Sequence, residues 1–218
     1  MGTYFRNVEQ YLDQIDKGDW IEIGVDRGEG STPWIAEQAK KRNVDFFAVD
    51  VDPVQISTAR QNFVKNQTMS PRIFLVESKG ESFLRDYARD HPDRKVSFAY
   101  LDNFDWNYWL GEQEEDFVPK VKQHYKDLMG VEMSNINSQI THMLQAMLLL
   151  NLMTANSIIM CDDTWFHPRE GVFIGKCSSA IPFLLMSGYR VLHSEGYRQN
   201  SGVILGKFEN EKNSTVLG

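Results

Sequence analysis

The sequence of 218 residues predicts an α/β fold, in which one doubly wound sheet of seven strands has helices on both faces. Short apolar segments alternate with helical patterns along the chain, as expected for a mostly parallel sheet. Most of these segments hold only about four to six apolar residues, which suits strands in the middle of a sheet. The last two segments lie too close together for a crossover helix, so they should pair antiparallel.

The predicted strands are read from apolar runs bounded by turn residues. In chain order they are Trp20–Ile23, Asp45–Asp50, Arg72–Glu77, Lys95–Leu101, Ser157–Cys161, Tyr189–His193 and Gly202–Phe208. The first five should form the parallel part of a Rossmann-like sheet, and the last two should form an antiparallel C-terminal pair.

The predicted helices are read from apolar residues at helical spacing and from capping residues. An apolar stripe in residues 1–18 predicts an N-terminal amphipathic helix. Ser31 or Thr32 can cap the next helix, which has Pro33 in its first turn and runs to about Arg42. The later helices are expected at Pro53–Lys65, Glu81–Arg89, Ile136–Leu150 and Gly175–Ser187.

The length and composition fit a single globular domain over residues 1–218. Residues 111–135 are the one candidate insertion, and we expect them to act as a lid over the sheet edge. Residues 209–218 are polar and are expected to form a flexible tail. The apolar faces of the N-terminal helix and of Met143–Met153 either support a homodimer or belong to the core.

The charge and cysteine content exclude several classes of protein. The formal net charge of −7 argues against bulk binding to nucleic-acid phosphates. Cys161 and Cys177 cannot build a disulfide framework, and no zinc-binding spacing is present in the sequence. The first residues lack a signal-peptide pattern, and Met143–Met153 is too short and too polar to cross a bilayer. We therefore expect a reduced, cytoplasmic protein with no membrane partner.

Polar and mostly acidic residues follow each of the first five predicted strands. They are Gly24, Asp26, Gly28 and Gly30; Asp50 and Asp52; Glu77, Ser78 and Lys79; Asp102, Asn103 and Asp105; and Asp162 and Asp163. Ligands of open α/β sheets bind beyond the carboxyl ends of the strands. Single residues of this kind can be turn or cap residues, but the whole set predicts a binding site.

The loop after the first strand is the most specific of these features. Its glycines allow positive φ angles and a close approach of the backbone to a ligand. A dinucleotide site would need a third glycine where Pro33 stands. Glu22, inside the strand, would repel a pyrophosphate and suits a cationic ligand better.

Two segments, WIEIGVDRGEGS (20–31) and FFAVDVDP (46–53), resemble the first two motifs of class I S-adenosylmethionine-dependent methyltransferases. The resemblance implies that Asp50 holds the ribose hydroxyls and that Gly24, Gly28 and Gly30 lie against the methionine part. It also implies that Glu22 positions this loop and the amino group, and that Ser78 and Lys79 contact the adenine. Further cofactor contacts are expected at Ser31, Val51, Asp102 and Asn103.

The segments LDNFDW (101–106) and MCDDTW (160–165) resemble the metal-dependent O-methyltransferases of the catechol and macrocin types. This resemblance implies a divalent-cation site formed by Asp102, Asp162 and Asp163. Three carboxylates suit Mg²⁺ and would repel one another without a cation. The ion would hold the oxygen of a small-molecule hydroxyl and lower its pKa.

The general base is less clearly marked in the sequence. The catechol type has a lysine where this chain has Asp105, and the macrocin type has an aspartate close by. Asp105 is therefore the candidate catalytic base, and a helix-cap role for it stays equally open. His124, His142 and His167 are alternative bases, of which His167 lies nearest to the predicted metal ligands in the sequence.

Two other functions are compatible with parts of the sequence. The segment Asp50–Val54 resembles the start of haloacid dehalogenase-like phosphatases, which would make Asp50 a nucleophile and Asp52 an acid and base. That alternative leaves Glu22 and the glycine loop without a role. The second alternative is a non-catalytic domain that keeps the methyltransferase fold.

Overall fold

The computed structural model describes residues 4–107, 117–197 and 200–209, and these form a seven-stranded sheet. The strands are β1 (Asp19–Ile23), β2 (Phe46–Asp50), β3 (Ile73–Glu77), β4 (Val96–Leu101), β5 (Met153–Asp162), β8 (Arg190–Glu195) and β9 (Gly202–Lys207). Their order is β3-β2-β1-β4-β5-β9-β8. Strands β1 to β5 are parallel, and β9 runs antiparallel to both of its neighbours. The predicted doubly wound sheet and its antiparallel pair are confirmed.

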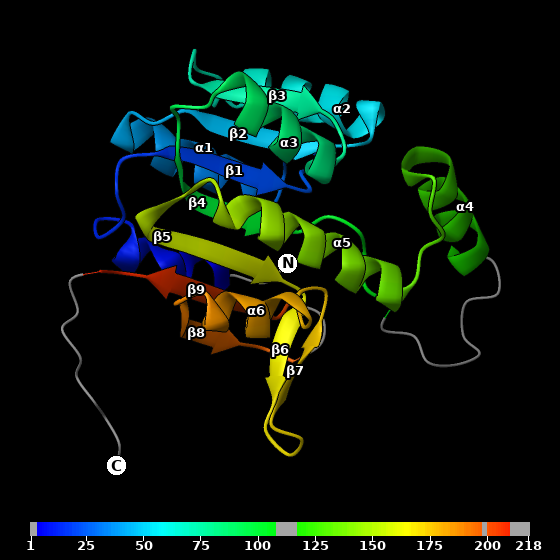
Figure 1. Ribbon diagram of the computed structural model, residues 1–218. Helices are drawn as coiled ribbons and strands as arrows, with labels where there is room; N and C mark the ends of the chain where they lie inside the picture. Colours follow the sequence, from blue (N-terminus) through cyan, green and yellow to red (C-terminus); the bar gives the residue numbers. More distant parts are fainter. Residues whose placement is uncertain (1–3, 108–116, 198–199, 210–218) are drawn as a thin grey trace.

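Helical segments pack on both faces of this sheet (Figure 1). One face is covered by η1 (Tyr4–Tyr11), α1 (Thr32–Arg42) and α2 (Pro53–Lys65). The other is covered by α3 (Gly80–Asp90), α5 (Asn135–Leu150) and α6 (Ala180–Met186). Each face has its own cluster of buried apolar side chains, so the central strands are buried on both sides, as the short apolar runs predicted.

The N-terminal segment departs from the prediction, because η1 is a 3-10 helix that ends at Tyr11. Contacts with the sheet explain the difference. The ring of Tyr4 lies over Gly202, where an added Cβ would be 2.0 Å from the ring. Further along, the Asp16 carboxylate accepts hydrogen bonds from the backbone and side chain of Asn156. Tyr4 and Val8 are buried in the core, so this face of the segment is not available for a dimer.

The predicted helix at Gly175–Ser187 is also partly wrong. A β-hairpin of β6 (Thr164–His167) and β7 (Val172–Gly175) precedes it, and α6 begins only at Ala180. Gly175 has a φ of +114°, and a Cβ there would be 2.0 Å from the carbonyl oxygen of Asp163. This tight contact between hairpin and strand end requires glycine and excludes a helix at this position.

Helix α4 (Phe117–Met129) lies within the stretch predicted as a lid, and it stands beyond the carboxyl ends of the parallel strands (Figure 1). The lid residues 111–116 and the tail residues 210–218 lie outside the described residues. On the outer side of α5, Ile136, Ile140 and Met147 are exposed. None of the helices in the described ranges combines the length and the apolar character that crossing a bilayer requires.

Candidate functional site

A cavity of about 550 Å³ lies at the carboxyl ends of the parallel strands. It lies where the order of the strands reverses, between β1 and β4, which is the usual ligand site of such sheets. The predicted site residues that line it are Gly24, Gly30, Ser31, Asp50, Val51, Ser78, Asp102, Asn103, Asp105, Asp162 and Asp163. Glu22, Gly28 and Lys79 are not among its lining residues.

The glycine loop has two distinct structural roles. Gly24 has a φ of +100°, and a Cβ there would be 2.5 Å from the backbone nitrogen of Asn103. Its bare backbone lets the ends of β1 and β4 meet at the cavity floor. Gly28 has a φ of +64° and packs against Ala59 and Phe63 of α2. Gly28 therefore lets the loop pack closely on α2, on the side away from the cavity, whereas the resemblance implied a contact with the cofactor.

Asp50, at the end of β2, organises this loop. Its Oδ2 accepts hydrogen bonds from the backbone N–H groups of Val25 (2.9 Å) and Asp26 (3.1 Å). Its Oδ1 accepts one from the backbone N–H of Asp52 at 2.9 Å. Burial raises the pKa of Asp50, while these three hydrogen bonds oppose the rise. Since Oδ1 still has a free lone pair, the carboxylate can also accept a ligand hydroxyl from the cavity.

Glu22 is completely buried beneath the loop. The hydroxyl of Ser31, at the start of α1, donates a hydrogen bond of 2.6 Å to Glu22 Oε1. Ser31 therefore binds Glu22 and does not cap α1 with its side chain. Burial raises the pKa of Glu22 to about 8, against the effect of the Ser31 hydrogen bond. Without a ligand, this carboxyl is mostly protonated at neutral pH.

The two residues predicted to contact adenine separate in the structure. Ser78 lines the cavity, next to Val51 and Gly80. The Lys79 side chain leaves the cavity, and its Nζ donates a hydrogen bond of 2.7 Å to the carbonyl oxygen of Met129. Lys79 thereby binds the C-terminal end of α4 and holds that helix against the site.

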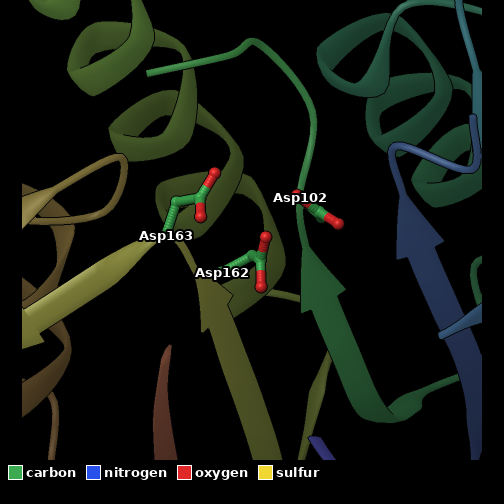
Figure 2. Close-up of side chains that lie close together, drawn as sticks. All are labelled: Asp102, Asp162 and Asp163. Carbon is green, nitrogen blue, oxygen red and sulfur yellow. The ribbon is translucent and has the colours of Figure 1, made fainter. Parts of the chain in front are cut away.

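Asp102, Asp162 and Asp163 come together at the ends of β4 and β5 (Figure 2). One carboxylate oxygen from each residue lies within 4.8 Å of the others. Asp163 has a φ of +44°, an unusual value for a residue other than glycine, and this turn directs its side chain toward the cluster. The sequence correctly predicted that these three carboxylates would be neighbours.

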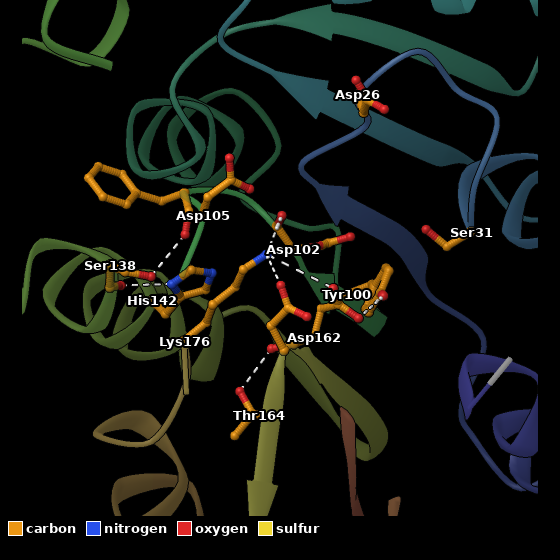
Figure 3. A network of polar contacts seen from close by, with 12 residues as sticks. Asp26, Ser31, Tyr100, Asp102, Asp105, Ser138, His142, Asp162, Thr164 and Lys176 are labelled. Atoms are coloured by element: carbon orange, nitrogen blue, oxygen red, sulfur yellow. Dashed lines mark hydrogen bonds and ion pairs between the residues drawn. The ribbon is translucent and has the colours of Figure 1, made fainter. Parts of the chain in front are cut away.

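Lys176 was missed by the sequence analysis, and it lies inside this acidic cluster (Figure 3). Its Nζ is 2.8 Å from Asp102 Oδ1, 3.1 Å from Asp163 Oδ2 and 3.9 Å from Asp162 Oδ2. The residue is only 1% exposed. Burial lowers the pKa of Lys176, but the three carboxylates outweigh it and raise that pKa above the usual value, so the ammonium stays charged.

Two tyrosines connect the N-terminal segment to the same cluster. The Tyr4 hydroxyl donates to the Tyr100 hydroxyl at 3.0 Å, and Tyr100 donates to Asp162 Oδ1 at 2.8 Å. Both tyrosines line the cavity. The sequence pattern marked Tyr4 only as an apolar position of a helix, so this role was also missed.

Asp105 lies at the cavity wall beside α4, where its backbone N–H donates to the Tyr125 hydroxyl at 2.8 Å. Its carboxylate is exposed and can accept a proton from a ligand. Among the histidines, His124 also lines the cavity, and its Nε2 is 3.3 Å from Asp52 Oδ2. His142 and His167 are not lining residues. Burial, and then the charge of Lys176, lower the pKa of His142 to about 3, so it stays neutral.

The sequence of this chain matches no protein-family model and no curated protein. Its structure is similar to solved methyltransferase structures. A proposed rRNA methylase from Clostridium thermocellum superposes with a TM-score of 0.57 at 11% identity, over 95% of this chain and 98% of the other. A proposed methyltransferase from Streptococcus mutans, solved with SAH (S-adenosylhomocysteine), gives 0.55 at 11%, over 95% and 99%.

A third similar structure is a proposed caffeoyl-CoA O-methyltransferase from Staphylococcus aureus. It gives a TM-score of 0.54 at 11% identity, over 93% of this chain and 79% of the other. At such identities the comparisons establish the fold alone. The chain has the Rossmann-like fold that these methyltransferases share, and any assignment of activity depends on the site residues.

Proposed function

We propose that the protein is an S-adenosylmethionine-dependent methyltransferase that acts on a hydroxyl group of a small molecule. One observation carries this proposal. A single cavity joins the glycine loop and Asp50 on one side to the carboxylates at the ends of β4 and β5 on the other. Its acidic lining suits a cationic sulfonium, and its size is typical of small-molecule sites.

The cofactor half of the cavity would be formed by β1, β2 and β3. Asp50 would accept the ribose hydroxyls, Gly24 and Gly30 would lie against the methionine part, and Ser78 and Val51 would border the adenine. Glu22 would hold the loop from below through Ser31. When bound, S-adenosylmethionine supplies a methyl group on a positively charged sulfur.

The acceptor half would be formed by β4, β5 and α4. The acceptor oxygen would attack the methyl carbon, and the electron pair of the breaking carbon–sulfur bond would stay on sulfur. The hydroxyl proton would pass to a carboxylate at the cavity wall, for which Asp105 is the proposed base. The main contribution of the protein is to position the two reacting groups in line.

The divalent ion implied by the sequence resemblance does not fit the residues present. The three carboxylates that would bind it already surround a buried lysine. The proposed reaction therefore contains no step that uses a metal.

The phosphatase alternative is less well supported. Three backbone N–H groups already bind the two oxygens of Asp50, which would have to act as the nucleophile. Asp52, the required acid and base, caps α2 through a hydrogen bond of 2.8 Å from the Val54 N–H.

The first experiment is isothermal titration of S-adenosylhomocysteine into the protein, once with Mg²⁺ and once with EDTA. We expect micromolar binding in both conditions, since the cofactor half needs no metal. Absence of binding in both would contradict the proposal and would favour a non-catalytic domain with this fold.

A further inference from the structure

The most informative residue that the sequence did not predict for the site is Lys176, which directly follows the hairpin of β6 and β7 and lies among the three carboxylates. Asp162 and Asp163 end β5, the chain then makes the hairpin of β6 and β7, and Lys176 follows directly. The Lys176 backbone N–H donates to the carbonyl oxygen of Asp163 at 3.1 Å. The hairpin therefore places Lys176 next to Asp162 and Asp163, the two carboxylates that precede the hairpin in the chain.

This position of the lysine is fixed by its immediate neighbours. Gly175 packs so tightly on Asp163 that any side chain at Gly175 would collide with it. On the other side of Lys176, the backbone N–H of Cys177 donates to Thr164 Oγ1 at 3.0 Å. The side chain is buried along its whole length, and the ammonium faces the cavity (Figure 3).

The ammonium already pairs with two of the three carboxylates that a metal would need. Nζ binds Asp102 Oδ1 and Asp163 Oδ2, and it also contacts the carbonyl oxygen of Asp102 at 3.3 Å. Asp162 Oδ1 is already bound by the Tyr100 hydroxyl. Cations such as Mg²⁺ and Ca²⁺ bind oxygens at about 2.0–2.6 Å, so an ion on these oxygens would lie within roughly 6 Å of the ammonium. The two positive charges would repel each other.

We propose that Lys176 is the permanent cation of the Asp102–Asp162–Asp163 cluster and that the cavity works without a divalent ion. The ammonium donates hydrogen bonds to Oδ1 and to the carbonyl oxygen of Asp102, and it forms an ion pair with Asp163 Oδ2. Lys176 is therefore a positioning residue that holds Asp102 and Asp163 in place. Activation of an acceptor would fall to a carboxylate base. This last step rests on the proposed methyltransferase function, whereas the exclusion of the metal does not.

The test is to measure Mn²⁺ binding by electron paramagnetic resonance and the effect of Mg²⁺ on the melting temperature. The wild type should show no saturable Mn²⁺ binding and no stabilisation. Lys176→Met keeps most of the length of the unbranched side chain but leaves three carboxylates without a cation. We expect this variant to bind one Mn²⁺ at least tenfold more tightly than the wild type does. Its melting temperature should rise by about 5 °C at saturating Mg²⁺.

Two further variants locate the effect. Lys95→Met removes a lysine at the opposite end of β4 from Asp102, where its Nζ contacts the Asn151 carbonyl oxygen, and this variant should behave like the wild type. Lys176→Met combined with Asp162→Asn should lose the gained site. Saturable binding of one Mn²⁺ to the wild type that Asp162→Asn abolishes would overturn the proposal. The wild-type titration decides the question even if Lys176→Met does not fold.

Binding of S-adenosylhomocysteine is measured separately on the same proteins. Failure of that binding would contradict the methyltransferase function, while the Mn²⁺ result would still decide the role of Lys176. The two proposals can therefore fail independently.

Discussion

The two halves of the cavity stabilise their carboxylates in different ways. In the cofactor half, backbone N–H groups of Val25, Asp26 and Asp52 bind Asp50. In the acceptor half, the main partners of the carboxylates are side chains, namely the ammonium of Lys176 and the hydroxyl of Tyr100. Backbone donors are present in every sequence, whereas side-chain partners have to be supplied by particular residues.

This difference separates what the sequence predicted from what it did not. The glycine loop and the strand-end acids are local patterns, and their backbone geometry follows from short segments. Lys176 and Tyr4 reach the cluster from a hairpin and from the N-terminal segment, each through long-range packing. A pattern that shows three acids at strand ends does not show which cation accompanies them.

The largest effect expected in the cofactor half concerns Glu22. Burial raises the pKa of this carboxyl in the folded protein to about 8, above the ordinary value of 4.5 that applies to the unfolded chain. Between these pH values the unfolded chain ionises and the folded one does not, so stability falls as the pH rises. The cost is complete above pH 8 and amounts to about 5 kcal/mol.

Glu22→Gln removes this ionisation and keeps an acceptor for Ser31. Its free energy of unfolding, measured in urea from pH 5 to pH 9, should exceed that of the wild type by an amount that grows up to pH 8 and then levels off. Glu37→Gln, on the exposed surface of α1, is the matched control. Parallel pH curves for Glu22→Gln and the wild type would show that Glu22 is not a buried, protonated acid.

The next effect tests whether backbone donors define the cofactor half. In Asp50→Asn, the amide NH₂ must face at least one of the three backbone N–H groups, because only one side-chain oxygen remains. Leaving one such donor unpaired costs about 1–3 kcal/mol and should distort the loop. We expect the affinity for S-adenosylhomocysteine, measured by calorimetry, to fall roughly tenfold to a hundredfold.

Asp86→Asn is the control for this change, because Asp86 pairs with Arg89 on the surface of α3. It should bind like the wild type. Equal affinities of Asp50→Asn and Asp86→Asn would remove Asp50 from the proposed ribose site and would weaken the contrast between the two halves.

The elements that the sequence analysis misjudged follow the same division. Most strands of the sheet were predicted to within two residues, since each is a local apolar run. Strand β5 begins at Met153, four residues before its predicted start, and β6 and β7 were not predicted. The helix expected from Gly175 was replaced by a hairpin and a turn, because the contact of Gly175 with Asp163 depends on tertiary structure. The sequence shows Lys176 only as a lysine between Gly175 and Cys177. This local pattern does not indicate that its ammonium pairs with the strand-end carboxylates.

The smallest expected effect concerns the chain of hydrogen bonds from Tyr4 through Tyr100 to Asp162 in the acceptor half. Tyr4→Phe removes the hydroxyl that donates to Tyr100 and keeps the ring that packs over Gly202. The loss of one buried hydrogen bond should lower the free energy of unfolding by about 1 kcal/mol in urea denaturation. Tyr11→Phe is the matched control, because the Tyr11 hydroxyl makes only a long contact of 3.4 Å to the Leu192 carbonyl oxygen. If both variants lose the same amount, the Tyr4 hydroxyl contributes no more than an ordinary surface group. A larger loss in Tyr4→Phe alone would support the conclusion that the N-terminal segment helps to hold Asp162, and that the acceptor half depends on side chains from distant parts of the chain.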